Sequence, residues 1–201
     1  MSQQSSFGHD DLPGGRAVGI NDRPLSLSRP ADQEDHLIGS LGASLQLVEY
    51  GDYECPFCAQ ALPGVRELIR EYGDQLLFAF RHFPLVSQHP HSWHAAQAAE
   101  AAGAQNRFWQ MHDHLLSHQH SLTDDELETH ARALGLDWAA FERDRKDPEL
   151  SERIRRDALS GLHSGVAGTP TFFVNGRRLE GGFRPAELGV AIAKALTATS
   201  S

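Results

Sequence analysis

Cys55 and Cys58 are the only two cysteines of the chain, and only the intervening loop residues Pro56 and Phe57 separate them. A structural disulfide stabilises a fold mainly by closing a long loop of the unfolded chain, and so short a spacer closes almost nothing. A structural zinc site needs about four ligands, and no second Cys-x-x-Cys pair supplies the missing two. The pair therefore favours a dithiol that opens and closes, which is redox chemistry, over two small core residues that are neighbours by chance.

The residues around the two cysteines predict a strand that enters a helix. Residues 45–50 are β-prone, and Gly51 and Asp52 break the strand just before the cysteines. Apolar residues then recur at helical spacing from 62 to 72, so the cysteines lie at the start of an amphipathic helix. Pro63 is expected to kink this helix.

This position assigns different roles to the two sulfurs. The thiolate of Cys55 would face the unpaired N–H groups at the helix start, which lower its pKa and make it the attacking sulfur. Cys58 lies one turn further into the helix, where it is expected to be more buried, and it would resolve the mixed disulfide by attacking the sulfur of Cys55. Asp52 and Glu54 flank the site, and their charges would oppose the thiolate if they lie close to it.

The rest of the chain predicts an α/β order with a long helical interruption. The polar residues 1–34, which contain several prolines and glycines, are expected to form a mobile arm. The predicted elements after the first helix are a strand at 76–83, helices over 91–164, hairpin strands at 171–174 and 178–183 around an Asn-Gly turn, and a helix at 185–196. The order is therefore β-α-β, a helical segment, then β-β-α.

The charge and composition argue against several classes of partner. A net charge of -9 at pH 7, with 27 acidic residues and no basic run, disfavours nucleic acid and a membrane surface. The sequence contains no apolar run of about eighteen residues, which is the length needed to span a bilayer. Residues 1–30 also lack the apolar core of a secretion signal. These features predict a cytoplasmic protein, in which a lone Cys-x-x-Cys pair is catalytic or sensing rather than structural.

Four segments, together with the predicted order of strands and helices, form a recognisable pattern. They are Val48-Glu49-Tyr50-Gly51-Asp52-Tyr53-Glu54-Cys55-Pro56-Phe57-Cys58, Arg81-His82-Phe83-Pro84-Leu85, Phe108-Trp109-x-Met111-His112-Asp113, and Gly168-Thr169-Pro170-Thr171-Phe172-Phe173-Val174-Asn175-Gly176. Together they resemble the DsbA-like branch of the thioredoxin superfamily, and most closely its soluble bacterial members and the similar domain attached to some sodium/proton antiporters. The resemblance implies a thioredoxin fold with its core in residues 35–90 and 165–198 and an inserted all-helical subdomain in residues 91–164.

The resemblance also implies roles for residues outside the dithiol. Glu49 lies six residues before Cys55 in an apolar strand, where similar proteins place an acid beneath the dithiol. If Glu49 is buried there, its raised pKa makes it a base for Cys58. Thr169-Pro170 resembles the cis-proline loop, whose residue before the proline offers backbone groups to an extended substrate. The alternatives are a solvent-facing Glu49 on an edge strand and an ordinary trans-proline turn.

The sequence thus predicts a thiol-disulfide oxidoreductase that acts on protein or peptide disulfides, exchanges electrons with another dithiol or disulfide, and needs no cofactor. Two alternatives stay open. One is a redox-sensing or metal-binding module in which the dithiol is a switch, and the other is a glutathione-linked transferase or isomerase on the same fold. Most of the 12 histidines, including His114 and His118 at i, i+4 spacing, are expected to be solvated or capping, so no metal site is predicted.

Overall fold

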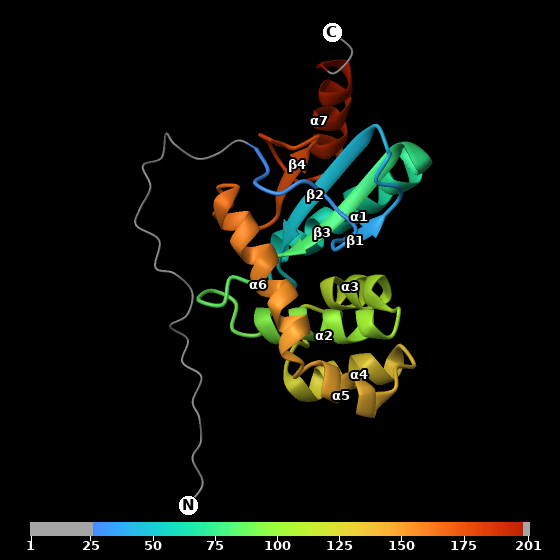
Figure 1. Ribbon diagram of the computed structural model, residues 1–201, viewed down its shortest axis with the longest axis vertical. Helices are drawn as coiled ribbons and strands as arrows, with labels where there is room; N and C mark the ends of the chain where they lie inside the picture. Colours follow the sequence, from blue (N-terminus) through green and yellow to red (C-terminus); the bar gives the residue numbers. More distant parts are fainter. Residues whose placement is uncertain (1–25, 199–201) are drawn as a thin grey trace, which may run out of the picture.

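The computed structural model describes residues 26–198, which form one five-stranded sheet and the helices around it (Figure 1). The strand order across the sheet is β1-β3-β2-β4-β5, in which β2 and β3 are parallel and all other neighbours are antiparallel. The strands are β1 (His36–Ile38), β2 (Leu45–Gly51), β3 (Leu76–His82), β4 (Thr171–Val174) and β5 (Arg177–Arg178). The helices are α1 (Pro56–Tyr72), the short 3₁₀ helix η1 (Gly73–Gln75), α2 (Ser92–Ala104), α3 (Phe108–Ser117), α4 (Asp124–Ala133), α5 (Trp138–Asp144), α6 (Pro148–His163) and α7 (Pro185–Ala198).

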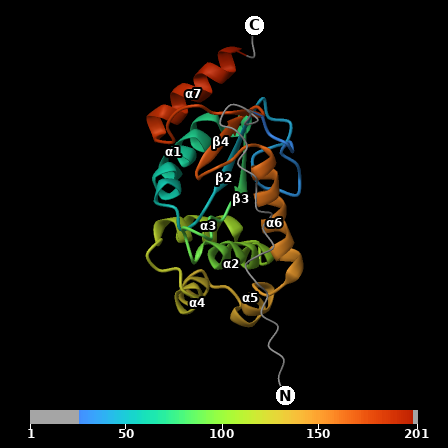
Figure 2. The ribbon, with the colours of Figure 1, turned by 90° about the vertical axis from the view of Figure 1, so that its left-hand side faces the viewer.

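The sheet lies between helices on both of its faces (Figures 1 and 2). α1 and α7 cover one face, α6 runs along the other, and α2 to α5 form a layer beyond one end of the strands. The side chains of β2 alternate between the two faces, because Leu47 belongs to the core cluster with Val65 of α1 and Tyr50 to the cluster that contacts Ala158 of α6. Glu49, two residues after Leu47, therefore points to the face that α1 covers.

The predicted α/β fold with an inserted helical segment is confirmed, and two strands differ from the sequence prediction. The sequence predicts no strand at 36–38, because three residues are too few to show a strand period. The second hairpin strand is predicted at 178–183, but β5 covers only Arg177–Arg178. The Asn-Gly turn itself is present, since Asn175 and Gly176 both have positive φ angles, of 47° and 78°.

Residues 26–34, which the sequence places in the N-terminal arm, are held against the sheet by a buried arginine. Arg81 of β3 is 0% exposed, and its guanidinium donates to the carbonyl oxygens of Arg29 at 2.9 Å and Pro30 at 2.8 Å. Its Nε and Nη2 also donate to the two carboxylate oxygens of Asp35, at 3.0 and 2.9 Å. A buried guanidinium requires such partners, so this segment is tied to β3. Residues 1–25 lie outside the described part of the chain.

The helices between β3 and β4 do not all lie in one layer. α6 leaves the layer of α2 to α5 and runs back along the sheet, where it packs against β2 and β3 (Figure 2). Thr123 is the N-cap residue of α4, and its backbone N–H donates to Glu126 at 2.9 Å in a capping box that fixes the start of the helix. Within residues 26–198, no helix combines the length and the apolar character that crossing a bilayer requires.

Candidate active site

The two cysteines lie at the N-terminus of α1, as the strand-turn-helix pattern predicts. Cys55 is the N-cap residue, and Pro56 begins the helix. The carbonyl oxygen of Cys55 accepts hydrogen bonds from the N–H groups of Cys58 at 3.0 Å and Ala59 at 3.4 Å. Both cysteines are free thiols, and their exposed fractions of 3% and 1% are nearly equal. Solvent exposure therefore distinguishes the two sulfurs less than the sequence suggests.

Hydrogen bonding and local charge distinguish the two thiols strongly. The pKa of Cys55 is lowered to about 5, chiefly because the thiol of Cys58 hydrogen-bonds to its thiolate, while burial opposes the shift and Thr169 and the N–H groups of Cys58 and Phe57 support it. The pKa of Cys58 is raised well above its ordinary value, first by burial and then by its hydrogen bond to Cys55 and the charge of Glu49. At neutral pH the pair therefore holds one thiolate, on Cys55, and one thiol.

Glu49 lies in the middle of the sheet, not on an edge strand. It is 3% exposed, and β2 places it between Phe80 of β3 and Phe172 of β4. The pKa of Glu49 is raised to about 8, first because burial disfavours the carboxylate and second because of the charge of Cys55. The structure thus brings this carboxyl group close enough to the dithiol for the two to interact, with a pKa near neutrality.

Thr169 and Pro170 lie against the dithiol, and the peptide bond between them is cis. The thiol of Cys55 donates a hydrogen bond to the carbonyl oxygen of Thr169 at 3.2 Å. The hydroxyl of Thr169 is buried and makes no hydrogen bond. The side chain of Thr169 also lowers the pKa of Cys55, so this hydroxyl is positioned to donate to the Cys55 thiolate.

Thr169→Val should therefore raise the pKa of Cys55, by about one unit if the hydroxyl contributes an ordinary hydrogen bond to a charged group. Valine keeps the shape of threonine and removes only the donor. The pKa is measured from the ultraviolet absorbance of the thiolate as a function of pH. Thr171→Val is the matched control, because the Thr171 hydroxyl donates to the carbonyl of Gly168 at 2.7 Å and should leave the pKa of Cys55 unchanged. Equal shifts in both variants would remove the special role of Thr169.

The two acidic residues that flank the cysteines are engaged by the segment that follows β3. Asp52 accepts hydrogen bonds from the backbone N–H of Leu85 and from Nδ1 of His89, both at 2.8 Å. Glu54 accepts from the backbone N–H of His91 at 2.7 Å and from its Nδ1 at 2.8 Å. The other oxygen of Asp52 accepts from the backbone N–H of Glu54, at 2.8 Å, within the turn itself. Both carboxylates, expected from the sequence to oppose the thiolate if they lie near it, are thus engaged by hydrogen-bond donors.

Gln119 is a site residue that the sequence analysis does not find. Its side-chain amide donates to the carbonyl oxygens of Tyr53 and Cys55, both at 2.8 Å, and so holds the turn that carries the dithiol. No motif marks this position, because it lies in the connection between α3 and α4 and reaches the turn only through the fold. Phe57 is 52% exposed beside the dithiol, and its ring lies 5.3 Å from that of Phe183.

His114 and His118 share a helix face, as their spacing allows. Their rings stack at a centroid distance of 4.2 Å, and Nε2 of His114 lies 3.0 Å from Nδ1 of His130 in α4. His130 Nε2 also lies 2.7 Å from the carbonyl oxygen of Ser121, and His118 Nδ1 lies 2.7 Å from that of His114, so all three imidazoles are engaged in hydrogen bonds within α3, α4 and their connection. The arrangement fits a packing role for this group.

Sequence comparison places similar segments in much longer proteins. The thioredoxin family model matches residues 31–194. The Na(+)/H(+) antiporter NhaA 1 of Salinispora arenicola is 42% identical over 183 residues, which are 90% of this chain and 28% of that protein. The antiporter NhaA of Herminiimonas arsenicoxydans is 44% identical over 163 residues, which are 81% of this chain and 26% of that protein. The chain therefore spans about a quarter of the length of these relatives.

Structural comparison finds the same fold in thiol-exchange proteins. A thioredoxin-like oxidoreductase from Silicibacter pomeroyi has a TM-score of 0.74 and 26% identity, over 83% of this chain and 94% of that one. BdbD from Bacillus subtilis has a TM-score of 0.72 and 21% identity, over 88% and 100% of the two chains. The thiol-disulfide exchange protein alpha-DsbA2 from Wolbachia pipientis has a TM-score of 0.72 and 22% identity, over 82% and 88%. With the matched family model and the Cys-x-x-Cys pair at the start of α1, these likenesses mean that the chain belongs to the thioredoxin family and has the fold of its DsbA-like members.

Proposed function

We propose that the protein is a thiol-disulfide oxidoreductase that acts on protein or peptide disulfides through Cys55 and Cys58. The thiolate of Cys55 attacks one sulfur of a substrate disulfide, forms a mixed disulfide with it and releases the other substrate sulfur as a thiolate. Cys58 then loses its proton and attacks the sulfur of Cys55. This step forms the Cys55–Cys58 disulfide and releases the reduced substrate. In the reverse direction the same steps oxidise a substrate dithiol, and the electrons pass between sulfurs without a further cofactor.

One observation carries this proposal: the two thiols of a single pair have pKa values shifted in opposite directions. The pKa of Cys55 is lowered to about 5, and that of Cys58 is raised well above its ordinary value. An attacking sulfur must be a thiolate and a resolving sulfur must wait as a thiol, so this asymmetry fits sequential exchange. A structural pair gains nothing from it.

The surroundings of Cys55 also fit an extended substrate. The backbone of Thr169 lies beside the reactive sulfur, within 3.2 Å at its carbonyl oxygen. Backbone groups in such a position bind a peptide by hydrogen bonds that make few demands on its sequence. The exposed ring of Phe57 and the neighbouring ring of Phe183 add an apolar surface to the same place, which suits a side chain next to the substrate cysteine.

The reduction potential tests the proposal. A pKa of about 5 lies between the values of about 3.5 for DsbA and about 7 for thioredoxin, whose potentials are about -120 and about -270 mV. We therefore expect a potential between these two when the protein is equilibrated with glutathione buffers. We also expect repeated turnover of a disulfide-containing peptide. A single oxidation without turnover would favour a redox sensor instead.

Glu49→Gln should slow release of the substrate several-fold near neutral pH and leave alkylation of Cys55 almost unchanged. The carboxylate takes the proton of Cys58, which an amide cannot do. In the mixed disulfide Cys55 has no charge, so only burial still raises the pKa of Glu49, and that pKa lies below 8. The release rate of the parent protein should therefore increase with rising pH as Glu49 ionises, with a midpoint below pH 8.

Rapid mixing of a preformed mixed disulfide measures the release rate as a function of pH. Glu54→Gln is the matched control, because Glu54 is bound to His91 and lies outside the proposed proton path. A release rate that is the same in the parent protein and in Glu49→Gln at every pH would leave Glu49 without a role in proton transfer.

The antiporter names belong to proteins of which this chain spans about a quarter, so the proposal concerns only the segment that they share with it. We infer a dithiol or disulfide partner for each half of the cycle, because the pair must be returned to its starting state after each exchange. The cytoplasmic location expected from the composition stays a prediction.

A further inference from the structure

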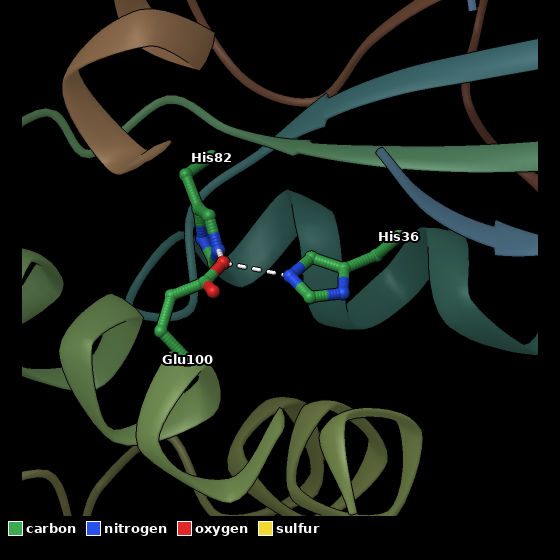
Figure 3. A group of neighbouring side chains, drawn as sticks. All are labelled: His36, His82 and Glu100. Atoms are coloured by element: carbon green, nitrogen blue, oxygen red, sulfur yellow. Dashed lines mark hydrogen bonds and ion pairs between the residues drawn. The ribbon is translucent and has the colours of Figure 1, made fainter. Parts of the chain in front are cut away.

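A second group of chemically active side chains lies apart from the dithiol, where three elements meet. His36 comes from β1, His82 from the end of β3, and Glu100 from α2 (Figure 3). His36 pairs with Phe80 in the sheet, two residues before His82, so both imidazoles leave the sheet on the side that α2 approaches. The sequence analysis assigns none of these residues to a site, because 64 positions separate His36 from Glu100.

Both imidazoles point the same nitrogen at the same oxygen atom. Nε2 of His36 lies 2.7 Å, and Nε2 of His82 lies 2.8 Å, from Oε1 of Glu100 (Figure 3). The three donor atoms all lie within 4.8 Å of one another, and among residues 26–198 this is the one such group of three His, Cys, Asp or Glu side chains. Two imidazole nitrogens and one carboxylate oxygen are a ligand set of Zn²⁺ sites that keep a position open.

The packing around the group holds both rings in place. The ring of His36 stacks on Phe108 at a centroid distance of 3.3 Å, and the ring of Phe80 lies edge-on to His82 at 5.4 Å. The side chain of His36 is 14% exposed, whereas those of His82 and Glu100 are 1% and 2% exposed, so His36 is the member of the group nearest to solvent. On a tetrahedral ion with metal–ligand distances of about 2.0–2.1 Å the donor atoms are about 3.3 Å apart, so each imidazole nitrogen must move away from Oε1 of Glu100 by about half an ångström.

One positive charge already lies at this carboxylate. Nε of Arg153 is 3.4 Å from Oε2 of Glu100, the oxygen that the imidazoles do not contact. This guanidinium opposes a cation, and its Nη1 also donates to the carbonyl oxygen of Glu34 at 2.6 Å, but it leaves Oε1 of Glu100 available. The contact predicts moderate rather than very tight affinity.

We propose that His36, His82 and Glu100 form a binding site for one divalent transition-metal ion of the Zn²⁺ type, separate from the dithiol. Bound there, the ion joins the edge of the sheet, through β1 and β3, to the first helix of the inserted segment. The site stabilises the contact between the sheet and the inserted helical segment, and disulfide exchange by Cys55 and Cys58 does not depend on it.

The test uses the full chain with both cysteines replaced, Cys55→Ser together with Cys58→Ser, because a dithiolate would itself bind the metal. Zn²⁺ is titrated against a chromophoric chelator, and Co²⁺ is followed by its visible absorption. We expect one equivalent of either ion, bound through nitrogen and oxygen and removed by a chelator. No binding by this protein would overturn the proposal, whatever its parent does in disulfide exchange.

Single substitutions in the same protein identify the ligands. His36→Gln should weaken Zn²⁺ binding at least tenfold, and Zn²⁺ should no longer raise its thermal midpoint as it raises that of the parent. His118→Gln, in the other histidine group, should bind as the parent does. Equal weakening by both substitutions would mean scattered surface binding and would overturn the site.

Arg153→Gln keeps the proposal testable if His36→Gln does not fold, because Arg153 is partly exposed and is not a ligand. It removes the positive charge beside Glu100, so Zn²⁺ should bind several-fold more tightly. Affinity that fails to increase would mean that Glu100 does not hold the ion, and the proposed ligand set would be wrong.

Discussion

Cys58→Ser should leave the protein covalently bound to its substrates, because it can still form mixed disulfides but can no longer release them. The variant loses the Cys58 thiol, which is the largest cause of the lowered pKa of Cys55, but the serine hydroxyl can donate in its place. Thr169 and the backbone N–H groups at the start of α1 still favour the Cys55 thiolate, so attack on a substrate disulfide continues. Nothing then resolves the mixed disulfide, because the second sulfur is gone. We expect covalent complexes with protein partners that disappear on treatment with a reductant, together with loss of nearly all turnover.

Cys55→Ser is the matched variant for this experiment. The remaining sulfur, Cys58, is 1% exposed and its pKa lies well above the ordinary value, so it should trap far fewer partners. A sensor or a metal-binding module predicts no difference between the two variants, because neither role requires attack on a foreign disulfide. Capture of glutathione alone by Cys58→Ser would replace protein disulfides with a small molecule as the substrate.

Sequence alone predicts the dithiol chemistry because that chemistry is local. The spacing of Cys55 and Cys58, the strand before them and the apolar period after them place both sulfurs at a helix start without knowledge of the rest of the fold. The asymmetry of their pKa values follows in direction from this position. One of its causes does not, because the contribution of Thr169 comes from a loop 114 residues away.

Non-local residues became visible only through resemblance or through the structure. Glu49 is buried because β2 pairs with β3 on one side and β4 on the other, and no local pattern shows which strands are central. The resemblance supplied that information for Glu49 and for Thr169. It supplied nothing for Gln119, whose two hydrogen bonds to the active-site turn depend on how the α3–α4 connection lies over α1.

The group around Glu100 shows the same limit more sharply. His36 lies in a strand of three residues, too short to predict, and its partners lie in an element of the sheet and in a helix of the inserted segment. The expectation that most of the histidines are solvated or capping was made without knowledge of which elements meet in the fold. Spacing detects pairs such as His114 and His118, but not donors that converge from three elements.

The pH dependence of Cys55 is the second large effect that we expect. With a pKa of about 5, its thiolate is almost fully formed at pH 7, whereas an ordinary cysteine with a pKa of about 8.5 is only a few per cent ionised. The rate of alkylation by iodoacetamide should therefore be nearly constant above pH 7 and should fall with a midpoint near pH 5. The label, located by mass spectrometry, should lie on Cys55 and not on Cys58.

The same shift makes the stability of the reduced protein depend on pH. The folded pKa of Cys55 is depressed from its ordinary value of about 8.5 to about 5, so its contribution to stability is fully present above about pH 9 and is lost as the pH falls to 5. The raised pKa of Glu49 acts with the opposite sign, because its contribution is present below pH 4.5 and is lost as the pH rises through about 8. The two effects partly cancel between pH 5 and 8.

Glu49→Gln removes one of these opposing effects and so isolates the other. In the reduced form of this variant, the free energy of unfolding should rise from pH 5 to 9 more steeply than in the reduced parent, and more steeply than in the oxidised form, which lacks a Cys55 thiol. Denaturant unfolding of both forms at several pH values measures the difference. An alkylation midpoint near pH 8.5, with reduced and oxidised forms that respond to pH alike, would contradict the assignment of Cys55 as the activated sulfur.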